Sequence, residues 1–271
     1  MGQNAVRHTV LILYALIVVL PVIDLVLLSF KSYAGIVGNP LTLPHVWHWS
    51  NYVKAWSQGD VGQYLINTTI VSVASTIMVL VFASMAAYVI ARFSFRGNQV
   101  IYLSFVLGLA MPITLIAIPL FVLMRQLNLV DNLWSLILVY SASGIAFAVF
   151  LLVNFIRGVP RDLEEAALID GAGYMQIFTR IILPLIRPSL TTVAVFHFVN
   201  SWNGFLVPLV LLQSPSRFTV TVGVLDFVGE YNTQWDLLLP TLVMVMLPTL
   251  IVFVIASKQF VRNMTAGAVK L

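Results

Sequence analysis

Six long apolar segments constrain this chain more than any other feature. Crossing the hydrocarbon core of a bilayer as a helix takes about 20 mostly apolar residues, and every one of these segments is long enough. Short polar stretches separate them, and only 9% of the residues are charged, whereas soluble domains carry about 25%. The sequence therefore predicts an all-α integral membrane protein with six transmembrane helices, at residues 9–30, 64–91, 100–124, 133–157, 186–212 and 237–260.

The 271 residues leave little chain beyond these spans. We expect a single transmembrane domain over residues 1–271, with its core at about 64–260. The first apolar run is too long for a signal peptide, and no small-x-small cleavage pattern precedes Lys31, so we expect it to be retained as a span. The chain has no cysteine, which excludes disulfides, thiolate metal sites and cysteine nucleophiles. We expect no metal or cofactor in this chain and, with a net charge of only +4, no nucleic-acid partner.

The placement of lysine and arginine predicts the orientation, because positive charge concentrates on the cytoplasmic side of a membrane protein. With the N-terminus inside, the outer side carries four basic residues: Lys31, Lys54, Arg125 and Arg217. The other ten of the 14 lie inside: Arg7, Arg92, Arg96, Arg157, Arg161, Arg180, Arg187, Lys258, Arg262 and Lys270. This bias predicts that both termini and the loop at 158–185 are cytoplasmic.

The loop at 158–185 has its own helical signals. Pro160 ends the helix of the fourth span, and Asp162 then has the position of an N-cap with Glu165 as its capping-box partner. Gly171 is placed to end this short helix, because glycine adopts the left-handed conformation at little cost. A second short helix follows from Tyr174 to Ile182 with an apolar stripe, and Pro184 is expected to end it. That stripe consists of Ile177, Phe178, Ile181 and Ile182.

The same loop carries a spaced motif: Glu165-Ala166-Ala167, three residues, Gly171, nine residues, Ile181, one residue, Leu183-Pro184. This pattern resembles the EAA signature of the membrane subunits of ABC importers, whose loop docks in a cleft of the ATPase. The resemblance implies a type I importer permease (MetI-like) fold and assigns 158–185 as a cytoplasmic coupling loop. It implies a charged contact for Glu165, close packing for the alanines and a bend at Gly171. The implied coupling residues are Glu165, Ala166, Ala167, Asp170, Gly171, Ile181, Leu183 and Pro184.

The fifth span supports a narrower resemblance. Its segment Ser201-Trp202-Asn203-Gly204-Phe205-Leu206-Val207-Pro208-Leu209 is similar to the Trp-Asn-x-Phe-Leu-x-Pro-Leu pattern of maltose-type (MalG-like) carbohydrate permeases. A sugar is held by hydrogen bonds and an aromatic platform. The candidate pathway residues are Asn203, the preferred one, with Trp202, Asn200 and Phe205. The alternative is that these polar groups make interhelical hydrogen bonds between subunits.

Two outer loops have open interpretations. At 31–63, Trp47, Trp49, Tyr52 and Trp56 form either an interfacial aromatic belt or a contact with an external protein. The polar stretch 213–236 is either a solvated connector or, by the resemblance to maltose-type permeases, a loop that reaches into the binding protein. Its tentative contact residues are Val224, Asp226, Gly229 and Glu230.

The resemblance also implies the partners: a second homologous permease, two ATPase subunits that carry the ATP and Mg, and an extracytoplasmic binding protein that delivers a sugar. It implies a multi-pass protein in the cell membrane of a prokaryote. An importer of glycerol 3-phosphate or another polyol is the alternative cargo class. A stand-alone secondary transporter is more remote, because Asp24 is the only acidic residue within the expected spans. An enzyme is disfavoured, because the Gly-x-x-x-x-Gly-Lys-Ser/Thr, His-Glu-x-x-His and Gly-x-Ser-x-Gly motifs are all absent.

Overall fold

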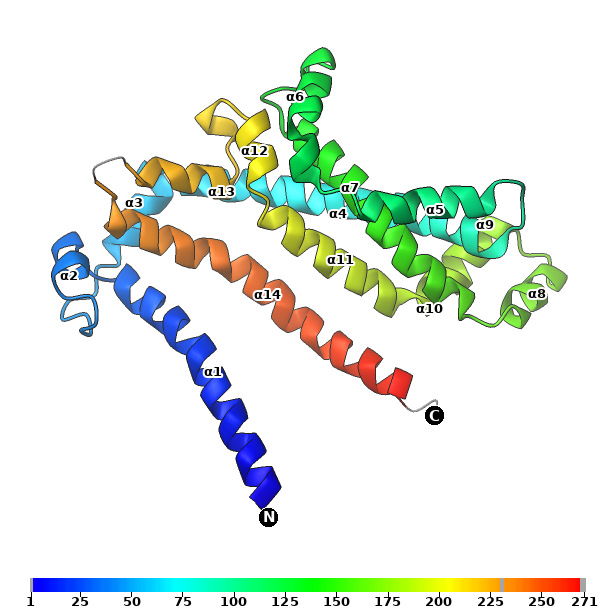
Figure 1. The fold of residues 1–271 in the computed structure, drawn as a ribbon, viewed down its shortest axis with the longest axis horizontal. Helices are drawn as coiled ribbons and strands as arrows, with labels where there is room; N and C mark the ends of the chain where they lie inside the picture. The colour runs from blue at the N-terminus through cyan, green and yellow to red at the C-terminus, as the bar shows by residue number, and fades with distance from the viewer. Residues whose placement is uncertain (1, 230–231, 269–271) are drawn as a thin grey trace. The chain divides into compact units, whose positions relative to one another are not determined.

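The computed structural model describes the backbone of residues 2–229 and 232–268, and the side chains of residues 6–229 and 232–256. Within these residues all regular secondary structure is helical, apart from one isolated antiparallel bridge between Val228 and Thr233, which confirms the all-α prediction (Figure 1). The long helices are α1 (Gly2–Ser29), α4 (Val61–Arg92), α7 (Leu133–Arg157), α11 (Arg187–Trp202) and α14 (Trp235–Ala268). The shorter ones are α2 (Tyr33–Gly38), α3 (Ser50–Gln58), α5 (Asn98–Leu109), η1 (Ile113–Ile116), α6 (Ala117–Gln126), α8 (Asp162–Ile169), α9 (Tyr174–Ile177), η2 (Phe178–Ile182), α10 (Leu183–Leu185), α12 (Leu206–Leu211), η3 (Pro215–Arg217), α13 (Val220–Gly223) and η4 (Val224–Phe227).

Four of the six predicted spans are single helices among the described residues. The segments Val6–Ser29, Val61–Arg92, Leu133–Arg157 and Trp235–Ala256 are each long and apolar enough to cross a membrane. Two further pairs of helices are long enough to cross a membrane only if the two helices of each bent pair are counted as one span. One pair, Asn98–Leu109 with Ile113–Gln126, bends by 88°, because Pro112 has no N–H group to continue the helix.

The fifth predicted span, 186–212, is broken and not one continuous helix. The helix α11 ends at Trp202, and α12 starts only at Leu206. At its other end, α11 continues from the segment Tyr174–Leu185 after a bend of 75°. A helix of 16 residues is about 24 Å long, so α11 by itself is shorter than the hydrocarbon core.

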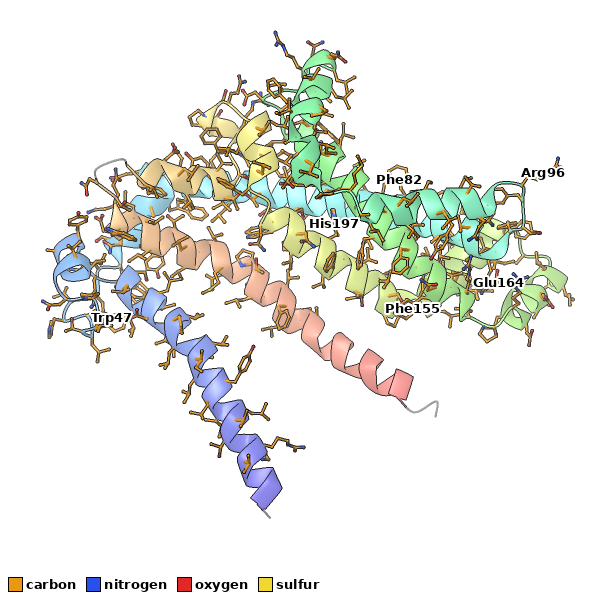
Figure 2. The ribbon with its side chains drawn as sticks, in the orientation of Figure 1. Trp47, Phe82, Arg96, Phe155, Glu164 and His197 are labelled. Carbon is orange, nitrogen blue, oxygen red and sulfur yellow. The ribbon has the colours of Figure 1, made fainter. Side chains whose placement is uncertain are left out.

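The chain divides into two compact units. The first consists of residues 1–65 and 220–248. Its small apolar core contains Ala55, Val61, Phe227 and Leu238. Three of the four predicted aromatic residues of 31–63 surround Phe30, whose ring centroid lies 5.0 Å from Trp47, 4.6 Å from Trp49 and 5.1 Å from Tyr52. Trp47 remains 50% exposed (Figure 2), so the cluster is only partly covered by its own chain.

The second unit consists of residues 66–219 and 249–271. Here α5 and α11 both pack on α7, and α8 and α9 lie at the end of α4 (Figure 1). Ala83, Ala87 and Ala91 are buried in the largest core cluster, so the small-residue stripe of α4 is a close-packing face. Leu152 and Ile156 of α7 and Ile182 of η2 are fully buried in the same cluster. This core therefore joins the membrane helices directly to the loop that carries the EAA motif.

Candidate functional site

The helix α8 carries the first half of the motif, and its N-terminus differs from the prediction. Asp162 is the first helical residue, and the N-cap is Arg161, with no side-chain hydrogen bond. The expected cap at Asp162 and its capping box with Glu165 are therefore wrong. Three acidic residues, Asp162, Glu164 and Glu165, instead lie in the first turn, where negative charge interacts favourably with the helix dipole.

The C-terminus of α8 confirms the role expected of Gly171. Its φ is +82°, and its N–H donates to the Leu168 carbonyl at 3.0 Å, while the N–H of Ala172 donates to the Ala167 carbonyl at 2.9 Å. These two bonds form a Schellman motif, which requires a residue in the left-handed conformation. A Cβ at Gly171 would meet no atom within 4 Å. Glycine is therefore required at this position by the backbone conformation, and not by a lack of space for a side chain.

The second helix of the loop runs further than predicted. It passes from α9 through the π-helical turn η2 into α10, so Pro184 lies within α10 and the bend comes at Ile186. The N–H of Leu183 donates to the Phe178 carbonyl in the π-helical pattern directly before Pro184, so the helix is already irregular where the proline lacks an N–H. The apolar stripe is confirmed: Ile177, Phe178 and Ile182 are buried, and Ile181 packs against the same core.

Glu164 is the residue that sequence reasoning missed. Its carboxylate (Glu164 is labelled in Figure 2) forms an ion pair with the Arg92 side chain at the end of α4. The side chains of Glu164 and Arg92 are only 11% and 6% exposed. Tyr88 donates a hydrogen bond from its hydroxyl to Glu164 Oε2 at 3.3 Å. Arg92 Nη2 also donates to the carbonyl of Val159, just before α8, at 2.9 Å. Arg92 therefore holds both α8 and the segment before α8 against the end of α4.

Aromatic rings fix the second helix to the same end of α4. The Tyr88 ring lies 5.2 Å from that of Phe178 and 5.8 Å from that of Phe93. Phe93 in turn contacts the ring of Tyr174 at 5.2 Å. Both helices of the loop are thus attached to one helix end, and displacing either of them would break contacts of that end.

The outer face of α8 remains uncovered. Glu165, Ala166 and Asp170 are exposed, and Ile169 is 87% exposed. Ala167 is half-buried and packs towards the core. Of the other predicted coupling residues, Gly171 and Pro184 are exposed, and Ile181 and Leu183 are half-buried. The exposed face of this loop therefore includes acidic side chains, small side chains and the exposed Ile169.

The polar residues of the fifth span separate into two groups. Trp202 is 1% exposed and stacks on Phe198 with ring centroids 5.5 Å apart. Asn203 is exposed and donates from Nδ2 to the Val199 carbonyl of its own helix at 2.9 Å. Asn200 and Phe205, in contrast, line a cavity of about 410 Å³ formed by η1, α7, α11 and α12. The structure therefore brings two of the four predicted pathway residues to one cavity.

His197 also lines this cavity and makes a buried contact with another helix. His197 Nε2 is 3.2 Å from Ser75 Oγ of α4, a hydrogen bond between helices of the kind that polar groups make inside membranes. A Cβ at Gly144 would lie 2.3 Å from His197 Nδ1, so the close approach of α7 and α11 depends on that glycine. His197 (Figure 2) is therefore a helix-packing residue.

The predicted external contact residues do not form a free loop. Val224 packs against the core of the first unit, and Asp226 Oδ2 accepts a hydrogen bond from the Tyr64 hydroxyl at 2.8 Å. Gly229 is exposed and directly follows Val228, which forms the bridge with Thr233. Glu230 lies outside the described residues. Of the predicted contact residues that the structure describes, Val224 and Asp226 are therefore bound to their own unit.

Comparison with known proteins decides the family. The model of the "Binding-protein-dependent transport system inner membrane component" family matches residues 79–265. The chain belongs to this family. It is thus a multi-pass inner membrane component, and membership does not favour a stand-alone secondary transporter or an enzyme.

Similar family members cover nearly the whole chain. The diacetylchitobiose uptake system permease protein NgcG of Streptomyces coelicolor is 35% identical over 265 residues, which is 97% of this chain and 88% of that protein. The arabinooligosaccharides transport system permease protein AraQ of Halalkalibacterium halodurans is 34% identical over 260 residues, with 94% and 92% covered.

Solved structures confirm the importer permease fold. A chain of a bacterial ABC transporter involved in the import of the acidic polysaccharide alginate superimposes with a TM-score of 0.83 at 24% identity, covering 94% of this chain and 95% of that one. A chain of the MetNI methionine ABC transporter gives a TM-score of 0.57 at 16% identity, over 75% of this chain and 95% of that one. The prediction of a MetI-like fold is confirmed.

Proposed function

We propose that this chain is one of two homologous permease subunits of an ATP-driven carbohydrate importer, and that α8 to α10 dock on a separate ATPase. The observation that carries the proposal is the exposed acidic face of α8 together with its buried attachment to α4. An exposed isoleucine beside small residues fits a groove in a protein partner, since apolar anchors among small neighbours pack closely. ATP and Mg belong to the two ATPase subunits.

The geometry suggests how the loop transmits motion. A partner that holds Glu165, Ala166 and Asp170 moves α8 as one body. The Glu164–Arg92 pair then moves the end of α4, because breaking a buried ion pair costs several kcal/mol. Through η2 and the bend at Ile186, the same displacement reaches α11. Opening and closing of the pathway is thus driven through the buried contacts between this loop and the membrane helices, and not through one exposed contact alone.

The cargo follows from the relatives and from the cavity. The relatives are named for the uptake of diacetylchitobiose and of arabinooligosaccharides. Among the residues that line the cavity of η1, α7, α11 and α12 there is no lysine or arginine. A neutral sugar suits this lining better than glycerol 3-phosphate, whose phosphate would call for a basic partner. The proposal favours Asn200 and Phe205 as pathway residues, because both line this cavity. A pathway role for Asn203 and Trp202 remains a prediction from the sequence.

The proposal also fixes the orientation. Both termini and 158–185 face the cytoplasm, and 31–63 and 213–236 face outward, where the turn at Gly229 meets the binding protein. Because the chain has no cysteine, single cysteines test this with an impermeant thiol reagent. We expect Val228→Cys to label in intact cells and Leu168→Cys to label only after permeabilisation. Labelling of Leu168→Cys in intact cells would place the loop outside and overturn the proposal.

A further inference from the structure

The cavity between η1, α7, α11 and α12 contains a hydroxyl that the fold leaves unpaired. Tyr140 is 7% exposed, and its Oη is buried without a hydrogen-bond partner among the described residues. More than nine in ten buried polar groups in proteins are paired, so an unpaired one calls for an explanation. A Cβ at Gly204 would lie 2.0 Å from Tyr140 Oη. Because Gly204 has no side chain, the Tyr140 hydroxyl can occupy its position beside the cavity.

The rest of the lining has the chemistry of a sugar site. Phe147 and Phe196 form a ring pair with centroids 4.4 Å apart and planes at 34°, and apolar faces of sugar rings pack on such surfaces. Asn200 donates from Nδ2 to the Phe196 carbonyl at 2.9 Å, which leaves its amide oxygen to accept a bond. The volume of about 410 Å³ lies within the ordinary range of ligand sites, about 300–1,000 Å³.

We propose that this cavity is a carbohydrate subsite of this subunit, in which the Tyr140 hydroxyl bonds a hydroxyl of the passing sugar. The inference rests on the proposed function and adds to it, since it gives this chain its own share of the cargo contacts. The subsite takes a short neutral sugar segment. Tyr140 stands in α7 and Asn200 in α11, so a sugar bound between them also senses the relative movement of those helices.

The variant Tyr140→Phe separates this role from a structural one. If the hydroxyl serves nothing, its removal takes an unpaired polar group out of the interior, which leaves stability unchanged or raises it. If the hydroxyl binds the cargo, stability is again unchanged or higher, but uptake falls. We expect uptake per ATP hydrolysed to fall about tenfold, because one lost hydrogen bond to a buried ligand has an effect of that order.

The experiment uses the complete transporter in proteoliposomes with its binding protein. The probes are radiolabelled oligosaccharides of N-acetylglucosamine, arabinose and glucose. The matched control is Tyr102→Phe, which removes the hydroxyl of a half-buried tyrosine of α5 that does not line the cavity. We expect the control to transport like the wild type, and Asn200→Leu to be impaired like Tyr140→Phe. Thermal unfolding and co-purification with the partner permease are measured for every variant.

The outcomes are distinct. Reduced uptake by Tyr140→Phe, with unchanged or higher stability and normal assembly, supports the subsite. Unchanged uptake overturns it. Lower stability or impaired assembly also overturns it, because the hydroxyl would then bond a protein group of the complex. These last two results leave the proposed function standing, whereas a wild-type complex that takes up none of the probes overturns the proposed function and the subsite together.

Discussion

We expect Glu164→Gln to lower the free energy of unfolding by about 3–5 kcal/mol and to abolish ATP-driven uptake. The neutral amide leaves the Arg92 guanidinium buried without its carboxylate, and an uncompensated buried charge has a cost of this order. The attachment of α8 to α4 is lost at the same time, so ATP hydrolysis no longer moves the membrane helices. Thermal unfolding in nanodiscs, followed by tryptophan fluorescence, and uptake by proteoliposomes measure the two effects.

The neighbouring carboxylate provides the matched control. Glu165 is exposed, so Glu165→Gln removes the same charge from the same helix and should leave the unfolding temperature unchanged. Replacing both partners, with Arg92→Leu and Glu164→Leu together, should regain much of the stability, because an apolar pair of similar size replaces a buried ion pair at little cost. A Glu164→Gln chain that unfolds at the wild-type temperature would contradict the role given to the pair.

The second large effect is expected from Gly171→Val. The left-handed φ of +82° is strongly unfavourable for a β-branched residue, so the Schellman motif opens and α8 loses its angle to α9. We expect uptake to fall to background while the chain still inserts into the membrane. Because a Cβ at this position would meet no atom within 4 Å, a change of side-chain volume alone should be harmless.

That difference gives the control for Gly171. Asparagine adopts the left-handed conformation more readily than other residues with a Cβ, so Gly171→Asn should retain most uptake and most stimulation of ATP hydrolysis by the loaded binding protein. If valine and asparagine impair transport equally, the backbone angle is not what the loop requires. Both rates are measured on the same reconstituted complex.

Much of this molecule follows from local patterns. Apolar length predicted the membrane helices because each span satisfies its own backbone hydrogen bonds. The apolar stripe of Ile177, Phe178 and Ile182 followed from helical spacing, and these three residues are buried. Gly171 followed from the preference of its backbone conformation. In each case the information lies within a few turns of one helix.

The features that could not be predicted depend on residues far apart in the sequence. Nothing near Glu164 indicates that it faces inward while Glu165 faces out, because the choice is made by Arg92, 72 positions earlier. The continuation of the helix through Pro184 depends on the π-turn before it, whose Phe178 packs against Tyr88 of α4. The break after Trp202 and the cavity beside it arise where η1, α7, α11 and α12 meet.

Photo-crosslinking from α8 tests the central claim, the docking of this loop on an ATPase, most directly. A benzophenone amino acid at position 169, where the native isoleucine is 87% exposed, is compared with one at position 41 in the first outer loop, where Leu41 is 92% exposed. In the assembled transporter we predict an adduct between position 169 and the ATPase subunit, and none from position 41. An assembled transporter in which position 169 gives no ATPase adduct would contradict the account.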